Sequence, residues 1–156
     1  MAYKAVDVAR YMIDRAEQKK TPLSNLKLQK ILYFVWKEYY AQKEEHLFED
    51  YFFAWQFGPV VPDVYYDYFM FGASPIVAGL LEDFDDSIIE EKDKVLIDEV
   101  LDKYAKESVF KLVNITHKAG AAWDRTYRNG IGNKEIISFK DIEEDVRNES
   151  GRKYNA

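Results

Sequence analysis

The chain has 156 residues, a formal net charge of −6 and no cysteine. This length fits one domain, and the acidic balance disfavours non-specific binding to nucleic acid or to an anionic membrane surface. The lack of cysteine excludes disulfides, thiolate zinc sites and a thiol nucleophile. With neither a signal-peptide pattern nor a long apolar run in the sequence, we expect a cytoplasmic protein.

Two amphipathic helices are predicted at the start of the chain. Apolar residues recur at spacings of three and four over residues 3–18, which predicts a helix with one buried stripe. The side chain of Ser24 or Asn25 can accept hydrogen bonds from the free backbone N–H groups at the start of a second helix. We expect this helix to run to about Lys43. Its apolar stripe is wide, so this helix should lie centrally in the fold.

Residues 52–66 concentrate aromatic side chains, two of the four prolines and one of the three tryptophans. The aromatic density before Gly58 favours one short extended ribbon. Gly58 can adopt a backbone conformation closed to other residues, and Pro59 pushes it towards an extended state. Pro62 suits the first turn of a helix. We therefore expect a rigid corner between ribbon and helix, with Trp55 packed into the joint.

The second half of the chain is expected to be mainly helical. The following elements are predicted: a connection over 73–87 with a short strand near Ile76-Val77, helices over 90–106, from Ser108 to near Gly120 and over 139–148, a turn containing Trp123 and Tyr127, and a brief strand over 135–137. The fold class is mainly α, a single compact domain of about five to seven helices with a small β ribbon or short strands. The domain should cover residues 1–149, and the tail 150–156 should fray.

Neither histidine belongs to a recognisable catalytic or metal-binding pattern. His46 and His117 have no second histidine at helical spacing, and the acidic run 82–87 lacks the glycine and closing glutamate of a calcium loop. The sequence has no phosphate-binding loop and no nucleophile elbow. We therefore expect no metal, no cofactor and no enzymatic activity, with a hydrolase using His117 and a carboxylate as an alternative.

Surplus tyrosine points to a protein partner. The adjacent pairs Tyr39-Tyr40 and Tyr65-Tyr66 cannot both face inward from one helix, so one member of each should lie near the surface. Tyrosine is favoured in interfaces because it offers a large, stiff contact area with a polar tip. Together with the acidic charge, this predicts contact with a basic protein.

Three motifs, in order and spacing, resemble the Panacea domain family, also called the SocA-like antitoxin or phage-associated GepA-like family. The motifs are SNLKLQKILYF over 24–34, FAWQFGPVVPDVY over 53–65, and Leu112-Val113, Thr116-His117 and Trp123. The family commonly has proline before the tryptophan of the third motif, where this chain has Ala122. The resemblance covers about residues 3–147.

The resemblance implies a mainly helical, cytoplasmic antitoxin that neutralises a protein toxin, usually encoded beside it, by direct binding. In one branch of the family the protein is instead an adaptor that delivers its toxin to a ClpXP-type protease. Gln29, Lys30, Tyr33 and His117 are the polar candidates for a partner groove. The partner-binding or motif residues are Gln29, Lys30, Tyr33, Trp55, Gly58, Pro59, Val60, Pro62, Tyr65, Tyr66, Thr116, His117 and Trp123, with Tyr65 or Tyr66 expected to touch the partner.

Overall fold

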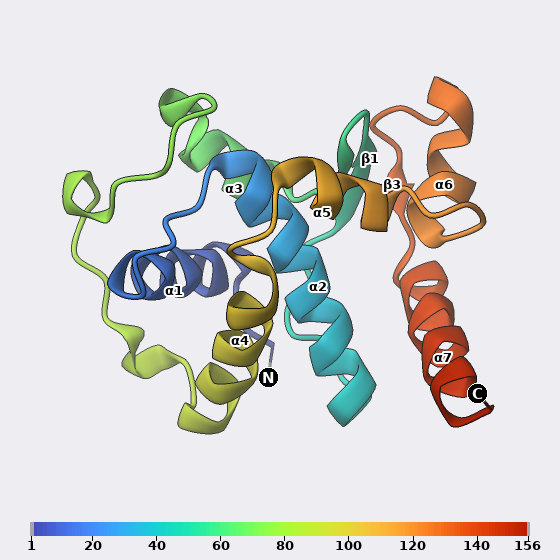
Figure 1. Cartoon of the computed structure of the whole chain (residues 1–156), viewed down its shortest axis with the longest axis horizontal. Coiled ribbons are helices and arrows are strands. Elements are labelled where there is room, and N and C mark those ends of the chain that lie inside the picture. The colour runs from blue at the N-terminus through green and yellow to red at the C-terminus, as the bar shows by residue number, and fades with distance from the viewer. Residues whose placement is uncertain (1, 156) are drawn as a thin grey trace.

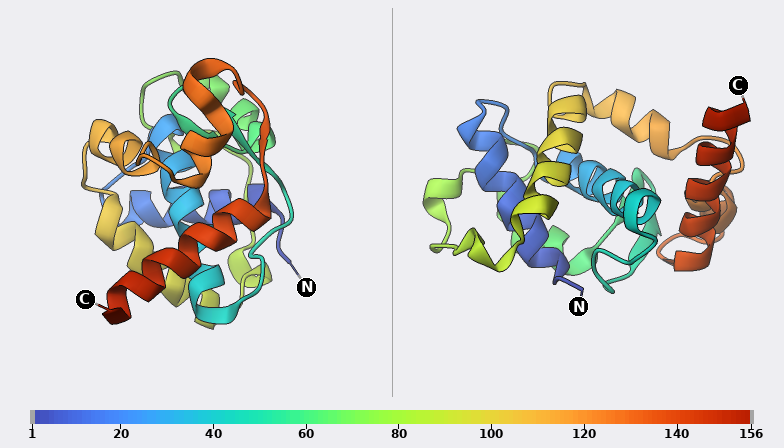
Figure 2. Two further views of the ribbon diagram at one scale, coloured as in Figure 1. Left: turned by 90° about the vertical axis from the view of Figure 1, so that its right-hand side faces the viewer. Right: turned by 90° about the horizontal axis from the view of Figure 1, so that it is seen from below.

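Helix α2 (Asn25–Lys43) runs through the middle of the molecule and organises the other elements (Figure 1). The computed structural model describes residues 2–155, with the side chains of residues 2–150. The elements in contact with α2 are α1 (Ala5–Gln18), α3 (Pro62–Asp67), α4 (Glu91–Tyr104), α5 (Val109–Thr116), α7 (Phe139–Asn155) and strand β2 (Gly58–Val60). Helices α1 and α4 lie on one side of α2 and α7 lies on the other, as Figure 2 also shows from below.

The position of α2 follows from its sequence. The Ser24 side chain accepts a hydrogen bond from the Lys27 backbone N–H at the start of the helix, as predicted. Its wide apolar stripe packs against neighbours on both sides, and Trp36 is fully buried. The Trp36 ring stacks on Phe139 of α7, with the ring centroids 5.3 Å apart. Helix α2 is therefore the core helix that the sequence predicts.

The prediction that one member of the Tyr39-Tyr40 pair lies near the surface is wrong. Both side chains are buried, because α2 has neighbours on both faces. The Lys43 ammonium lies over the Tyr39 ring, and Arg147 of α7 donates a hydrogen bond to the Tyr40 hydroxyl (2.7 Å). The same prediction is confirmed for the second pair, in which Tyr66 is exposed.

A small antiparallel sheet packs against the side of α2, with strand order β2-β1-β3. Its other strands are β1 (Phe52–Trp55) and β3 (Ile136–Ile137). Strands β1 and β2 form a tight hairpin, in which Trp55 pairs with Gly58 across a two-residue loop. The predicted single ribbon followed by a corner is thus corrected: Gly58-Pro59-Val60 is itself a strand, and the chain reverses before it. The strand near residue 136 is confirmed.

The helix after the hairpin begins where the sequence predicts. Pro62 occupies the first turn of α3, and a 3₁₀ turn (Phe69–Phe71) then ends at Gly72. No strand forms at Ile76-Val77 within the described residues. The connection to α4 instead holds two 3₁₀ turns, Ala78–Leu80 and Asp86–Ile88.

The C-terminal helices differ from their predictions at their ends. Helix α5 is capped by the Ser108 side chain as predicted but ends at Thr116 rather than near Gly120. A helix, α6 (Ala122–Tyr127), replaces the predicted turn. Helix α7 begins after the predicted Ser138 cap and continues to Asn155 rather than ending near 148.

The expected fold class is confirmed, since residues 2–155 form seven α-helices and one three-stranded antiparallel sheet. Fraying of the tail stays a prediction, because its side chains lie outside the described residues. No helix within the described chain is long and apolar enough to cross a membrane.

Candidate partner-binding site

The first two sequence motifs meet at the outer edge of β2. This edge has no neighbouring strand, and side chains of α2 occupy the place of one. The Gln29 side-chain oxygen accepts a hydrogen bond from the Val61 N–H (3.0 Å), and Lys30 Nζ donates to the Pro59 carbonyl (2.9 Å). Proline has no N–H to offer at this edge. The strand edge is therefore closed by α2, which prevents it from pairing with another chain.

Gln29 also connects the start of α2 to α3. Its side-chain nitrogen donates to the Asn25 side-chain oxygen (3.1 Å), and the Asn25 nitrogen donates to the Tyr65 carbonyl (2.9 Å). Both amides are buried, and unpaired amides at such positions would cost about 1–3 kcal/mol each. This relay fixes the position of α3 relative to the hairpin.

Lys30 is fully buried, which is unusual for a lysine. Among the described side chains, no carboxylate is paired with it. Burial lowers the pKa of the Lys30 ammonium to about 7, because a charge away from water is costly. Its hydrogen bond to the Pro59 carbonyl lies at the end of the apolar part of the side chain. Lys30 therefore supplies one hydrogen-bond donor to the free edge of β2.

Gly58 lies directly against this lysine and the third motif. Its φ of +118° belongs to a region that favours glycine, and a Cβ here would lie 2.7 Å from Thr116 Oγ1 and 3.0 Å from Lys30 Nζ. The Thr116 hydroxyl is held in place by donating to the Val113 carbonyl (2.8 Å). Glycine is therefore required by both its conformation and its close packing.

The third motif reaches the hairpin through Trp123, whose indole N–H donates to the Trp55 carbonyl (2.8 Å). The Trp123 ring stacks on His117 at 3.8 Å and on Tyr127 at 4.6 Å between centroids. His117 Nε2 is buried and has no hydrogen-bond partner. Burial, followed by the nearby Lys30 charge, lowers the pKa of His117, so this ring is a neutral packing surface.

These contacts define a hub in which all three motifs stabilise one hairpin. Its members share contact with the hairpin backbone or with each other: Gln29, Lys30, Gly58, Pro59, Thr116, His117 and Trp123. The hub explains why these residue types occur together although they lie far apart in the sequence. Its polar groups are satisfied internally, apart from His117 Nε2.

A groove lies beside the hub, with a cavity volume of about 510 Å³. It is enclosed by the start of α2, the hairpin, the α3 region and the loop after α6. Its lining is mainly apolar and aromatic: Asn25, Leu26, Gln29, Trp55, Gln56, Phe57, Val60, Tyr65, Phe69, Gly72, Tyr127, Asn133 and Lys134. Mainly apolar concavities of this size are typical of binding sites. We call it the aromatic groove.

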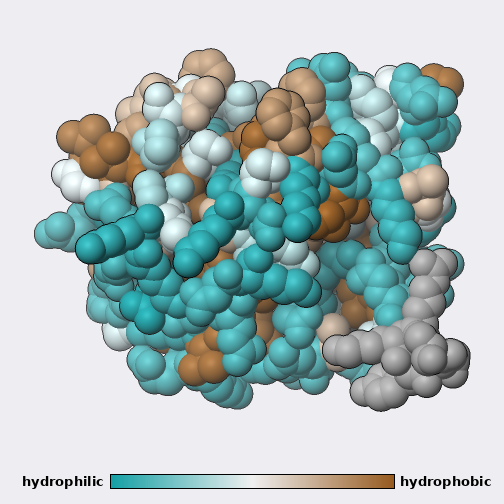
Figure 3. Space-filling model, viewed as in Figure 1, coloured by the Kyte–Doolittle hydropathy of each residue, from teal (hydrophilic) through white to brown (hydrophobic). Residues whose placement is uncertain are grey.

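Exposed rings continue from the groove onto the surrounding surface. Trp55 packs edge-on against Tyr65 (4.9 Å) and Tyr66 (6.3 Å). The side chains of Phe57, Tyr66 and Phe69 are 56%, 62% and 63% exposed. Large apolar rings clustered in water mark an interaction surface. By contrast, Figure 3 shows a hydrophilic face over α4, with apolar residues mainly over α5 and along the upper edge.

The structure separates the predicted site residues into two groups. The side chains of Gln29, Lys30 and Tyr33 are buried, and of these three only Gln29 lines the groove among the described residues. The Tyr33 ring packs edge-on against Phe52 inside the core. The other predicted residues fall into two sets. One set shapes the backbone or the hub: Gly58, Pro59, Pro62, Thr116, His117 and Trp123. The second set belongs to the groove, which is lined by Trp55, Val60 and Tyr65 and has Tyr66 on its rim.

Several groove residues were not predicted from sequence. Phe57 belongs to the aromatic-rich segment 52–66, whereas Phe69 lies three residues beyond it, and both rings are exposed. Tyr127, at the end of α6, and Lys134, in the loop that follows, are brought to the groove by tertiary packing that no local sequence pattern indicates. The Lys134 N–H donates to the Ala54 carbonyl (2.7 Å), which joins this loop to β1.

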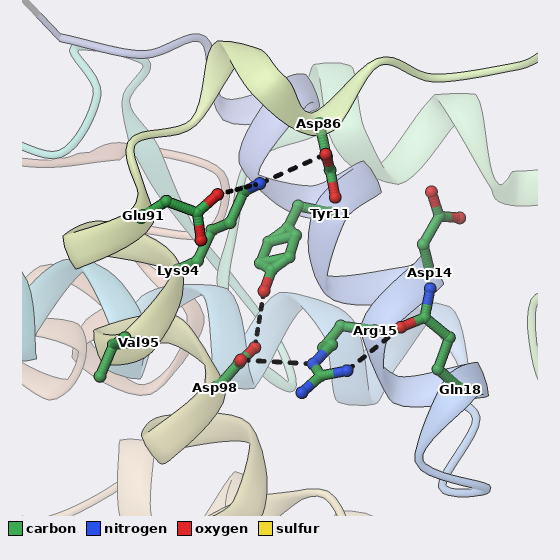
Figure 4. Close-up of a pocket in the computed structure, with 9 residues that line it drawn as sticks. All are labelled: Tyr11, Asp14, Arg15, Gln18, Asp86, Glu91, Lys94, Val95 and Asp98. Atoms are coloured by element: carbon green, nitrogen blue, oxygen red, sulfur yellow. Dashed lines mark hydrogen bonds and ion pairs between the residues drawn. The ribbon is translucent and has the colours of Figure 1, made fainter.

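A second, smaller hollow of about 240 Å³ lies between α1 and α4 and is lined mainly by charged side chains (Figure 4). Its charges are paired within the hollow or, for Asp14, with Arg10 outside it (2.9 Å). Lys94 lies between Asp86 (3.2 Å) and Glu91 (3.1 Å), and Asp98 accepts from both Tyr11 and Arg15. These contacts hold α1 against α4. Because the described charges are paired, the hollow is a structural contact rather than a candidate ligand site.

The described side chains form no cluster of three residues suited to a metal. His46 is held by Glu143 of α7 (2.7 Å) and Glu49 (3.2 Å), and its ring packs against Phe139. Burial lowers the pKa of His46, but the two carboxylates outweigh this, so its pKa is raised overall. His46 thus connects the segment after α2 to α7.

Comparison with known proteins identifies the family. The family model described as "Antitoxin SocA-like, Panacea domain" matches residues 28–124, a range that contains most of the first motif and all of the second and third. The protein named "Antitoxin SocA" of Caulobacter vibrioides (strain NA1000 / CB15N) is 32% identical over 133 residues, which covers 80% of this chain and 70% of the relative. No solved structure matches. The chain therefore belongs to the SocA-like antitoxin family of Panacea-domain proteins.

Proposed function

We propose that this antitoxin-family protein neutralises a protein toxin by binding it directly through the aromatic groove, without catalysing a reaction. One observation carries the proposal: the hairpin built by the family's motifs presents the exposed ring of Phe57 in its loop and the half-buried ring of Trp55 at its end, and both rings line the groove. The motifs thus hold an interaction surface in place. The polar groups of the hub are mostly engaged with one another, which leaves contact rather than chemistry as the role of this region.

The groove has the properties of an affinity-determining contact site. Aromatic side chains in well-packed, desolvated pockets account for much of the binding free energy of protein interfaces. The hub fixes the hairpin before binding, and the Asn25 relay fixes Tyr65. A pre-organised surface loses less conformational entropy when a partner binds, so more of its contact energy appears as affinity.

We further propose that the toxin is a basic cytoplasmic protein encoded beside this one. The formal charge of −6 supports a basic partner, because opposite net charges accelerate diffusional encounter. This attraction acts over the whole surface and weakens with salt. It therefore affects the rate of association more than the identity of the contact residues.

The proposal is tested by co-expressing this chain with the product of the neighbouring gene. We expect that product to stop growth when expressed alone, to be harmless with this chain present, and to co-purify with it at fixed stoichiometry. A neighbouring product that is harmless alone, or that stays toxic and unbound in the presence of this chain, would contradict the proposed function.

The role of the groove is tested separately with a matched pair of exposed phenylalanines. Phe57→Ala removes a ring that lines the groove, whereas Phe110→Ala removes a 78% exposed ring on α5 that does not line it. We expect Phe57→Ala to weaken the binding of that product by about 2 kcal/mol, and Phe110→Ala to change it by less than 0.5 kcal/mol. Equal effects would move the contact surface elsewhere.

Direct masking and proteolytic delivery make different predictions. If binding alone neutralises the toxin, rescue persists in a strain that lacks its ClpXP-type protease. If this chain is an adaptor, deletion of the protease abolishes rescue and leaves binding intact. We expect rescue to persist.

A further inference from the structure

The charge of the aromatic groove differs from that of the whole chain. The chain has 28 acidic residues, yet among the described side chains no carboxylate lines the groove, and Lys134 is the single charged residue that does. Helix α3 lines the groove through Tyr65, but its exposed acids Asp63 and Asp67 do not line the groove. An overall acidic protein thus presents an apolar groove with one cation.

Lys134 is available for a partner and is held in position. Its ammonium lies 5.6 Å from the centroid of the Trp55 ring, and its backbone N–H donates to the Ala54 carbonyl. No carboxylate lies within ion-pair distance of Lys134 among the described side chains. The neighbouring Glu135 is engaged instead by Arg128, at 3.3 Å. The cation is therefore placed over an aromatic wall without a counter-charge.

We propose that the groove binds an apolar segment of the toxin that carries a carboxylate placed against Lys134. This inference rests on the proposed function and specifies the chemistry of the bound segment. The apolar side chains of that segment would cover Trp55 and Phe57, and the same contact would remove water from around Lys134. A carboxylate paired with a cation in such a place forms a strong, charge-assisted hydrogen bond, whereas a lysine or arginine there would be repelled.

The inference is compatible with a toxin that is basic overall. The acidic surface outside the groove attracts a basic protein over distances of about a Debye length, roughly 8 Å at physiological salt. The groove acts only at contact, where Lys134 distinguishes an acidic segment from a basic one. The acidic surface thus attracts the toxin, and the groove selects the segment of the toxin that is bound.

The test measures the dissociation constant of the purified neighbouring-gene product for the full chain and its variants. Lys134→Glu reverses the charge, and Lys134→Gln removes it. The matched control is Lys103→Glu, because Lys103 is also exposed, also lies over a ring (Tyr104, 5.2 Å) and lies on α4 outside the groove. We expect Lys134→Glu to weaken binding at least tenfold, Lys134→Gln at least threefold, and Lys103→Glu less than twofold.

The outcomes separate this inference from the proposed function. If wild-type chain does not bind the product, the proposed function fails. If wild-type chain binds and Phe57→Ala weakens binding, but Lys134→Gln binds as wild type or Lys134→Glu binds more tightly, only the present inference is overturned. Circular dichroism and thermal unfolding of each variant confirm that its fold is retained, and Lys134→Gln provides the decisive measurement if Lys134→Glu unfolds.

Discussion

The hub and the aromatic groove share one hairpin but use it in opposite ways. In the hub, polar atoms are buried and paired, as in the contact of Lys30 with the Pro59 carbonyl. In the groove, apolar rings are exposed and uncovered, as with Phe57 and Phe69. Each arrangement is costly alone, since buried charge and exposed aromatic surface both raise the free energy. Together they indicate that the buried hub holds the hairpin in a shape that leaves the rings of the groove exposed to solvent.

Substitutions in the hub and in the groove should have different effects. Most motif residues lie in the hub, so their substitution should change stability first and binding only as a consequence. Groove residues such as Phe57 and Lys134 should change binding with little effect on stability. The ratio of the two effects therefore assigns a residue to one region or the other.

The largest effect on stability is expected from Gly58→Val. A side chain at φ +118° is strained, and its Cβ would lie 2.7 Å from Thr116 Oγ1, inside the hub. Strain and overpacking of this kind together cost about 3–5 kcal/mol. Thermal or urea unfolding measures the loss.

The control for this substitution is Gly79→Val, because Gly79 has no heavy atom within 4 Å of an added Cβ and no positive φ. We expect it to change the unfolding free energy by less than 1 kcal/mol. A folded Gly58→Val protein with wild-type stability but no toxin binding would assign Gly58 to the groove and reverse the comparison.

The second effect is a dependence of stability on pH that Lys30→Met should remove. Burial lowers the pKa of Lys30 to about 7 in the folded chain, below its ordinary value near 10.5. Between these values the unfolded chain binds more protons, so stability rises with pH. The Lys30 contribution should amount to about 2 kcal/mol between pH 7 and pH 9.

Urea unfolding of wild type and Lys30→Met at both pH values measures this contribution as a difference. Taking the difference is necessary because His46, whose pKa is raised, contributes stability that is lost as pH rises. An equal pH dependence in the two proteins would show that the pKa of Lys30 is not lowered in the folded chain.

Local features of the fold could be predicted from sequence because their partners are close in the chain. The side chains of Ser24, Ser108 and Ser138 each accept a hydrogen bond from the backbone N–H three residues further on. The starts of three helices could therefore be predicted. Helix α6 was missed for the opposite reason. Its first N–H, on Ala122, is capped by the side chain of Asp145, which lies in α7.

The site was predictable only in part, again because of sequence distance. The motif residues marked the segment that forms the hairpin, although a ribbon and a corner were expected there, and Lys30 was expected to be a polar residue of a partner groove rather than a buried one. Its partner, the Pro59 carbonyl, lies 29 positions away. Lys134 was not identified at all, because its placement over Trp55 depends on the pairing of its loop with β1.

A smaller effect on stability is expected from Trp123→Phe. The substitution retains an aromatic ring between the positions of His117 and Tyr127 but removes the N–H that donates to the Trp55 carbonyl. Loss of this hydrogen bond and the smaller ring should cost about 1–2 kcal/mol. Binding of the toxin should weaken only to the extent that the hairpin becomes mobile. A loss of binding with unchanged stability would place Trp123 in the contact surface.

The smallest effect on stability is expected from Tyr66→Ala. Tyr66 lies on the rim of the groove, 62% exposed, and its main neighbours are the rings of Trp55 and Tyr65. Its removal uncovers little core surface, so the unfolding free energy should change by less than about 0.5 kcal/mol. Binding should weaken by about 1 kcal/mol, since tyrosine at an interface contributes contact area at low entropic cost. Calorimetric titration and thermal unfolding of the same sample compare the two quantities. If Tyr66→Ala instead lowered stability by more than about 1.5 kcal/mol, the rim would belong to the hub, and the boundary between the two regions would lie further out on α3.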